Sequence, residues 1–542
     1  MTFLEKSPFP WLTKGALAIL ISGCGINDLE FGNLDIPDYE PTLAVPLGVS
    51  RYTMRELVGD LQDNALTIEE GEDLFMTIVY MDTSYNDERE AFLYFPPINK
   101  SDIVFPFVSS SPAGETEVIE FEKVITFSFD AFFGEQVDSI FFNSGNLALE
   151  INSRFRSDVI LEFGFPSMFE TADNSSVSIS DTLSFGTTVP VTSIKRMPLG
   201  GKKFLFRRRE EANDFDVIIK GKVVVKPGQS VDFSDFFRFS IDFQEATYSH
   251  VHGYFDRKEG LLQDRTIELK FFETFGDYGL DFKDPKIILK VDNSFGFPSG
   301  LLMNNLSASN NDSTSVALTG TITESLQFVN YPKLDSIGKT SHSEFVINAQ
   351  NSNIRELFGI TPVKFNLPLT VISNPDVFEK DYLNFMTDSS RFRTITVVEL
   401  PFEVRMQEFT TNLKFGTDEI DLKNLQEAAL RFYTENEMPF EGRLAVNFAD
   451  ENDTILFTVP EELVLTAPQV DASGRTLESK KLLSEIELGT EGTEALKSAD
   501  HLNVAIIINT FNAADEEYVK LYADYKLDIN ISVLGRLKIK TQ

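Results

Sequence analysis

The chain has 542 residues, and its excess of Asp and Glu over Lys and Arg gives a formal net charge of -36 at pH 7. This acidity argues against nucleic-acid binding, which needs clustered Lys and Arg side chains against phosphate. The single cysteine excludes an intrachain disulfide, while 42% apolar residues and 50 phenylalanines supply hydrophobic cores for three or four domains.

The first element is an apolar segment with lysines before it and a cysteine after it. Lys6 and Lys14 precede an apolar stretch that ends at Ile21, and two small residues separate this stretch from Cys24. Charged, apolar and then small residues is the order of a secretory signal peptide and its cleavage site. The sequence therefore predicts a signal peptide over residues 1–23.

The four residues Ile21-Ser22-Gly23-Cys24 resemble the lipobox of bacterial lipoproteins. The resemblance implies a diacylglycerol and palmitate membrane anchor on Cys24. Asp28 and Glu30 resemble the export signal of surface lipoproteins in Bacteroidota. Together these features imply the outer membrane, with the body of the protein at the cell surface in preference to the periplasm. The alternative is a free buried cysteine behind an ordinary signal peptide or in a first strand.

Two later segments carry a broader resemblance. The opening Pro41-Thr42-Leu43-Ala44-Val45-Pro46-Leu47 is similar to the start of large, uncharacterised all-β surface or outer-membrane lipoproteins of Bacteroidota. The phrase His252-Gly253-Tyr254-Phe255, which precedes Asp264-Arg265-Thr266-Ile267-Glu268, is also similar to that family. The resemblance covers most of the chain, and it brings no catalytic motif.

After a polar tether predicted over 24–42, apolar alternation with a period of two dominates the chain, which is typical of half-buried strands. Val217–Val225 predicts one strand, and Val231–Phe233 predicts the start of the next. Between them, Pro227-Gly228 suits the centre of a type II turn, because proline fixes the first φ and glycine accepts a positive second φ.

The predicted helices are few and short. Thr53 and Asn353 are each followed three residues later by a glutamate, which indicates capping boxes. Glu478–Leu488 has helical spacing. The predicted fold class is therefore predominantly all-β, with tandem immunoglobulin-like β-sandwich domains and few short helices.

A three-fold internal similarity organises the chain. A strand, a break at an asparagine and a second strand recur around Asn143, Asn293 and Asn436, at spacings of 150 and 143 residues. Repeats of this length are typical of consecutive domains and not of a solenoid. We place an N-terminal β domain at 43–135 and three sandwich repeats at 136–282, 283–425 and 426–542.

His250 and His252 are the one candidate metal pair. Two residues apart on a predicted strand, they face the same side, and Asp256 could supply a third ligand. No third histidine lies nearby in the sequence, and no cysteine is available there as a further metal ligand. The preferred interpretation is therefore two histidines on a solvated strand face.

One basic island interrupts the acidic chain. It consists of Lys202, Lys203, Arg207, Arg208 and Arg209. A strand end whose positive charge offsets neighbouring carboxylates is the simpler interpretation. The functional interpretation is a contact for an acidic partner, either a protein or lipopolysaccharide.

The sequence carries no G-x-S-x-G elbow, no phosphate-binding loop and no H-E-x-x-H motif. We therefore expect no enzyme and no cofactor. The predicted function is that of a lipid-anchored scaffold or accessory subunit in an outer-membrane complex, with β-barrel proteins and other lipoproteins as partners, as in the outer-membrane protein assembly machinery or a secretion translocon. The alternatives are a glycan-binding surface lipoprotein and, from a third class, a glycosidase or peptidase.

Overall fold

A computed structural model describes most of the chain as paired β-strands. The described residues are 42–59, 66–86, 105–106, 112–129, 135–206, 213–269, 272, 280–375, 383–416 and 425–537. The predicted fold class is confirmed: the protein is all-β, with several antiparallel sheets packed as sandwiches and few short helices. Cys24 and Arg207, Arg208 and Arg209 lie outside the described residues.

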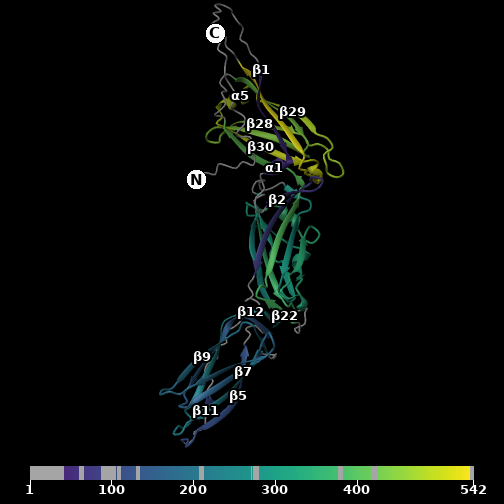
Figure 1. Cartoon of the computed structure of the whole chain (residues 1–542). Helices are drawn as coiled ribbons and strands as arrows, with labels where there is room; N and C mark the ends of the chain where they lie inside the picture. The colour runs from purple at the N-terminus through teal and green to yellow at the C-terminus, as the bar shows by residue number, and fades with distance from the viewer. Residues whose placement is uncertain are drawn as a thin grey trace, which may run out of the picture.

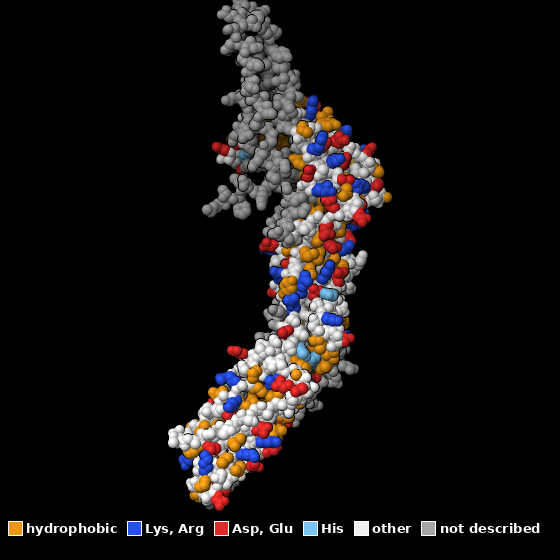
Figure 2. Space-filling view, viewed as in Figure 1, with side chains coloured by type: hydrophobic (Ala, Val, Ile, Leu, Met, Phe, Trp, Pro, Cys, Tyr) orange, Lys and Arg blue, Asp and Glu red, His pale blue; other side chains and the backbone are white. Residues whose placement is uncertain are grey.

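Three sandwiches lie in a row and give an elongated molecule (Figure 1). The terminal sandwich holds the first and last described strands, the middle sandwich follows it, and the distal sandwich forms the far end. Acidic and basic side chains are interspersed over the face seen in Figure 2. In the described part of the chain, no helix has the length and apolar character needed to cross a membrane.

In the distal sandwich one layer follows the order β4 (Phe105–Pro106), β12 (Phe236–Tyr254), β6 (Gln136–Ser153), β9 (Val191–Pro198). The other layer follows the order β5 (Glu117–Phe129), β11 (Asn213–Val225), β7 (Asp158–Glu170), β8 (Ser176–Leu183). A short strand, β10 (Lys202–Leu205), pairs with both β6 and β7 and joins the layers. Phenylalanines fill the space between the layers: the rings of Phe163 and Phe239 are 5.2 Å apart.

The middle sandwich has the same two-layer plan. Its first layer is β2 (Leu66–Glu70), β3 (Met76–Asn86), β23 (Phe392–Pro401), β15 (Lys286–Asn293), β20 (Ser341–Ile347). Its second layer places β21 (Lys364–Ser373) between β13 (Lys258–Glu268) and the broken strand β16 (Ser299–Leu302) and β17 (Ser307–Ser309). At its outer edge lie β18 (Ser315–Ala317) and β19 (Gln327–Val329).

The terminal sandwich repeats this plan a third time. One layer is β1 (Thr42–Thr53), β32 (Lys526–Leu537), β26 (Leu425–Asn436), β29 (Lys480–Glu487). The other is β25 (Phe409–Gly416), β30 (His501–Thr510), β27 (Phe440–Ala449), β28 (Ile455–Leu465). The short helices are α1 (Met54–Gly59), α3 (Thr321–Glu324), α4 (Ile354–Gly359), α5 (Gly489–Ser498) and the single turns Leu334–Ser336 and Ala513–Asp515.

All three sandwiches share one strand order. The short strands β2 and β10 are left out here, and β16 with β17 and β18 with β19 each count as one strand. The strands of each sandwich, numbered one to eight along the chain, then have the order 1-8-3-6 in one sheet and 2-7-4-5 in the other. This is the order of a jelly roll, in which two Greek keys form two packed sheets. It differs from the immunoglobulin-like order that was expected from the sequence, because the basic immunoglobulin fold has seven strands.

The chain visits the three sandwiches twice. The first strands β1, β3 and β4 belong in turn to the terminal, middle and distal sandwiches, and the other seven strands of each sandwich then follow in reverse order. The three first strands thus come from the range predicted as an N-terminal domain, 43–135, except that β1 begins one residue earlier, at Thr42. The boundaries proposed near 135, 282 and 425 stay predictions.

The predicted break after each third strand is a buried corner. At the ends of β15 and β26, the Oδ1 atoms of Asn293 and Asn436 accept the backbone N–H two residues later, both at 2.8 Å. In the distal sandwich Ser153 has this role, since its Oγ accepts the N–H of Phe155 at 3.3 Å. Asn143, the asparagine that the sequence pattern pointed to, lies exposed on β6.

Local predictions had mixed outcomes. The turn after β11 is confirmed, with Gly228 at φ 82° and the Gln229 N–H donating to the Lys226 carbonyl. Val231–Phe233 is not a strand: Val231 and Asp232 are irregular, Phe233 lies in a turn, and β12 begins only at Phe236, where it pairs with β6. The helix predicted over Glu478–Leu488 is wrong: β29 occupies it and pairs with β26, and the helix α5 begins only at Gly489.

The two capping boxes also differ from each other. At the start of α1, the Thr53 N–H donates to Glu56 Oε2 at 2.8 Å, and the Glu56 N–H donates to Thr53 Oγ1 at 3.3 Å. This reciprocal box is as predicted. At α4, the Asn353 side chain contacts Glu356 but accepts the N–H of Thr319, so it ties the helix to the preceding loop instead of capping it.

The joints between sandwiches are built from strands and buried polar groups. A short strand, β22 (Asn384–Thr387), pairs with the end of β12 where the distal and middle sandwiches meet. There the amides of Asn374 and Asn384 bond each other in both directions, at 2.8 and 3.0 Å. Between the middle and terminal sandwiches, β14 (Leu280–Phe282), β24 (Glu403–Met406) and β31 (Val519–Lys520) form a small sheet. One hydrophobic cluster runs through both joints.

Candidate functional site

The outer face of the distal sandwich carries a shallow groove over β6 and β12. On β6, Leu149 and Ile151 point into the core, so Glu150 and Asn152 point outward. On β12, Phe237 and Phe239 are buried by the same alternation. The groove therefore consists of the side chains that the two central strands of this sheet turn away from the core.

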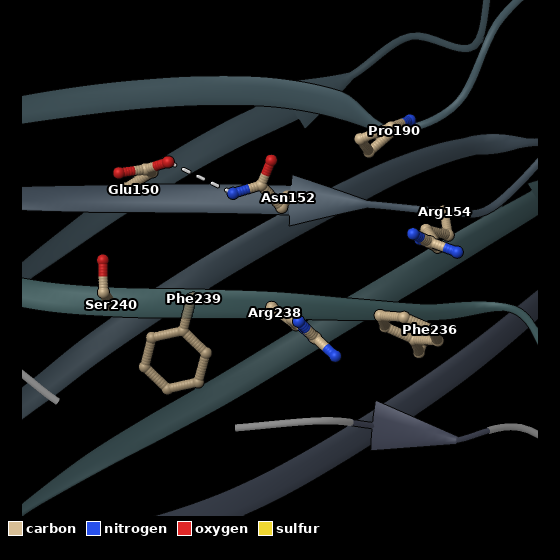
Figure 3. A pocket seen from close by; sticks show the side chains of 8 residues that line it. All are labelled: Glu150, Asn152, Arg154, Pro190, Phe236, Arg238, Phe239 and Ser240. Carbon is tan, nitrogen blue, oxygen red and sulfur yellow. Dashed lines mark hydrogen bonds between the residues drawn. The ribbon is translucent and has the colours of Figure 1, made fainter. Parts of the chain in front are cut away.

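Strand pairing sorts the groove into three rows. Glu150 lies opposite Ser240, and Asn152 lies opposite Arg238. In the third row, the backbone N–H of Arg154 donates to the carbonyl of Phe236 at 2.8 Å. Each row is separated from the next by two residues, or about 6.6–6.8 Å along a strand. Figure 3 shows these side chains along the two strands, with Pro190 at the rim.

Two guanidinium groups share one aromatic ring at the end of this groove. The guanidinium carbon of Arg154 is 5.4 Å from the centroid of the Phe236 ring, and that of Arg238 is 5.1 Å from it. Both distances are within the range of cation–π attraction. The Phe236 ring is therefore a shared contact of the two cations.

The opposite end of the groove is polar and acidic. The amide nitrogen of Asn152 donates to Glu150 Oε1 at 3.2 Å, and the Thr192 hydroxyl donates to Asn152 Oδ1 at 2.5 Å. The hollow has a volume of about 290 Å³. Among the described residues that line it, Glu150 is the one carboxylate. The groove can bind by charge and hydrogen bonding.

A second hollow, of about 530 Å³, lies over the other layer of the distal sandwich. Its outward side chains alternate in sign, and Lys222 forms an ion pair with Glu120 at 2.6 Å. Phe121 packs over Gly221, where a Cβ atom would be 1.9 Å from the ring. This face is a self-compensated strand surface, and it offers no concentrated charge.

The predicted basic island is described only at Lys202 and Lys203. Lys202 is mostly buried on β10 and forms an ion pair with Glu170 at 2.9 Å. Lys203 contacts Asn174 in the turn after β7. Both lysines therefore bind groups of their own sandwich. Their proposed role toward an acidic partner stays a prediction.

His250 and His252 lie together at the joint between the distal and middle sandwiches. Their ring centroids are 5.2 Å apart, and the His250 ring stacks on Phe141 at 4.0 Å. Histidine side chains are visible at this joint in Figure 2. Over the described ranges, no cluster of three or more His, Cys, Asp or Glu side chains is arranged to hold a metal ion.

Burial governs the protonation of both histidines. Desolvation lowers the pKa of His250, partly opposed by the charge of Asp388. Desolvation, reinforced by the charge of His250, lowers the pKa of His252 to about 4. The Nδ1 atom of His252 is buried without a hydrogen-bond partner. A neutral imidazole tolerates this environment better than an imidazolium.

The groove residues were not predicted from the sequence. Arg154, Phe236 and Arg238 come from two strands more than 80 residues apart in the sequence, and only the pairing of β6 with β12 brings them together. The one local signal was the alternation of charged and apolar residues near the end of each strand. That pattern is common to every solvated sheet face.

Comparisons with known proteins assign no family. No family model matches the chain, and no curated protein matches it. A solved structure of a protein from Parabacteroides distasonis, described as secreted, is similar over 92% of this chain and 100% of its own, at 12% identity and a TM-score of 0.28. The tandem CBM22 domains of Paenibacillus barcinonensis Xyn10C cover 53% of this chain and 86% of their own, at 7% identity and a TM-score of 0.14. At these scores the likenesses carry no argument about function.

Proposed function

We propose that this protein is a non-enzymatic, lipid-anchored protein of the outer membrane that works as a scaffold or accessory subunit of a β-barrel complex at the cell surface. The arrangement of the chain supports this proposal. β1 and β32 pair in one sheet, so both ends of the described chain belong to the terminal sandwich. Thr42, the first residue of β1, is 18 residues after Cys24.

In this proposal the lipid on Cys24 holds the terminal sandwich near the membrane, and the distal sandwich extends away from it. The joints support a rigid extension. At the joint between the middle and terminal sandwiches, the Phe402 N–H donates to the Met76 carbonyl and the Leu521 N–H donates to the Phe402 carbonyl, both at 2.9 Å. At the joint between the distal and middle sandwiches, Lys258 forms a buried ion pair with Glu135. Rigid sandwiches in series offer partner proteins a long, fixed surface.

The placement of aromatic side chains favours a scaffold over the glycan-binding alternative in its original form. A glycan platform of that form needs neighbouring exposed tyrosines or phenylalanines. In the described part of the chain, the exposed aromatic side chains are Tyr85, Phe233, Phe328 and Tyr433, and they belong to different sandwiches or layers. The fully buried aromatic side chains are instead phenylalanines in the cores.

Affinity purification from solubilised outer membranes tests the proposal. We expect the wild-type protein to co-elute with β-barrel proteins and other lipoproteins, identified by mass spectrometry. Cys24→Ala should leave the membrane fraction and no longer co-purify with these partners from membranes. If purified Cys24→Ala still binds the same partners when they are mixed in detergent, the substitution has removed only the anchor. Recovery of the wild-type protein alone would refute the scaffold role.

An epitope inserted beside Gly186, in the exposed turn between β8 and β9, tests the orientation. The turn is open, since a Cβ atom at Gly186 would have no neighbour within 4 Å. An antibody should label the epitope on intact cells. Labelling only after permeabilisation would place the body of the protein in the periplasm.

A further inference from the structure

We propose that the groove on the outer face of the distal sandwich binds an acidic saccharide through the carboxylate of a uronate-type sugar unit. This inference goes beyond the scaffold role and does not depend on it. The groove is defined by residues of the paired strands β6 and β12 and by the residue that directly follows β6: Glu150, Asn152, Arg154, Phe236, Arg238 and Ser240.

The anion-binding end is the pair Arg154 and Arg238. Guanidinium groups are planar and bind a carboxylate with two parallel hydrogen bonds, which an ammonium cannot do. The centroid of the Phe236 ring lies within 5.4 Å of both guanidinium carbons, so cation–π attraction favours side-chain positions beside the ring. The protein as a whole carries a net charge of -36. Two guanidinium groups in contact with one ring therefore favour an anionic group at this end.

The remainder of the groove fits hydroxyl groups. Moving away from the arginines, a ligand meets the Asn152 amide, then Ser240 and the Glu150 carboxylate. Glu150 repels a second anionic group but accepts hydrogen bonds from hydroxyls. One row separation is about 6.6–6.8 Å, so a carboxylate at the arginines leaves the hydroxyls of the same sugar ring beside Asn152 and Glu150. A volume of about 290 Å³ suits a single sugar unit.

The backbone around the groove argues against a peptide ligand. Peptides bind to sheets chiefly by adding a strand at a free edge, where backbone groups are unpaired. Here β6 pairs with β9 on one side and β12 on the other along the whole groove, so it offers no free edge, and β12 pairs with β4 at Phe236 and Phe237. The side chains of the groove present charge and hydroxyl-binding groups.

Isothermal titration of the purified full-length protein tests the inference. The probes are oligogalacturonate and oligoglucuronate, each compared with its methyl ester, which keeps every hydroxyl and loses the negative charge. We expect the acids to bind and the esters to bind at least about tenfold more weakly, because a hydrogen bond to a charged group is worth about 1.5–3 kcal/mol. Binding of the acids should weaken with salt, as expected for exposed charges.

Arg154→Ala and Arg238→Ala should each lower the affinity for the acids about tenfold or more. Arg238→Lys keeps the charge but cannot donate two parallel hydrogen bonds to a carboxylate, so its affinity for the acids should lie between those of wild type and Arg238→Ala. The matched control is Arg196→Ala, on β9 of the same outer face but outside the groove. It removes the same charge and should leave the affinity unchanged. Thermal unfolding confirms that each variant is folded.

Four outcomes with the saccharide probes would overturn the proposal. They are equal binding of the methyl esters, unchanged affinity in the Arg154→Ala and Arg238→Ala variants, equal loss in Arg196→Ala, and no binding of either acid at millimolar concentration. Tighter binding of a polyglutamate peptide than of the saccharides would assign the groove to acidic proteins instead. None of these results bears on membrane anchoring or on the scaffold role.

Discussion

At the residue scale, His252, at the joint between the distal and middle sandwiches, makes the stability of the protein depend on pH. Its pKa is lowered to about 4, first by desolvation and then by the charge of His250. An unfolded histidine has a pKa of about 6.5. The folded state therefore binds fewer protons than the unfolded state between these values, and stability that is fully present above pH 6.5 is lost as the pH falls toward 4.

We expect His252→Gln to flatten this pH dependence. One pKa unit corresponds to about 1.4 kcal/mol, but the half-buried ring is partly screened by solvent, so acidification from pH 7.5 to 4.5 should cost the wild type about 1–2 kcal/mol more than the variant. Denaturant unfolding at both pH values measures the difference. An identical loss of stability in the two proteins would show that other groups control the acid response.

At the element scale, the corner after each third strand is the feature that the three sandwiches share most closely. Asn436 is fully buried, accepts the Met438 N–H, and donates to the carbonyls of Phe440 and Thr466 at 2.9 and 3.0 Å. Asn436→Ala should lower the free energy of unfolding by about 3 kcal/mol, because buried backbone groups lose their partners.

The matched control for this prediction is Asn143→Ala. The sequence pattern places Asn143 at the equivalent position of the distal sandwich, but its side chain lies exposed on β6. We expect a change within about 0.5 kcal/mol, as for most surface positions. Calorimetry of both variants compares them directly. A loss of similar size at Asn143 would contradict the equivalence of Ser153, Asn293 and Asn436.

Elements defined by local chemistry could be predicted from the sequence. The Thr53 capping box and the turn at Gly228 depend on residues three or four positions apart, and both are present. The helix predicted over Glu478–Leu488 was wrong because the helical spacing of this segment competes with its pairing to β26, a strand about 50 residues earlier. The same reason hid the groove, since neither Arg154 nor Phe236 carries information about the other in the sequence.

At the scale of the whole molecule, the order in which strands are used sets the shape. The chain lays down β1, β3 and β4 on its way to the distal end and completes the three sandwiches on its way back. Each sandwich except the distal one therefore joins segments separated by hundreds of residues. Such a path brings both ends of the described chain, β1 and β32, into one sheet of the terminal sandwich.

The nested path predicts a long-range effect of a small deletion. Removing residues 42–53 deletes β1, whose partner β32 runs from Lys526 to Leu537. β32 then becomes an edge strand with one row of unpaired backbone groups. We expect faster amide hydrogen exchange in β32, because exchange reports local opening.

Exchange in β11 of the distal sandwich, Asn213–Val225, is the internal control, because these residues pair only with β5 and β7. In a chain of consecutive, independent domains, the deletion would leave both strands protected, because both lie outside the N-terminal domain predicted at 43–135. Mass spectrometry of exchanged peptides distinguishes the two cases. Protection that is lost in β32 and retained in β11 requires the terminal sandwich to be assembled from both ends of the chain.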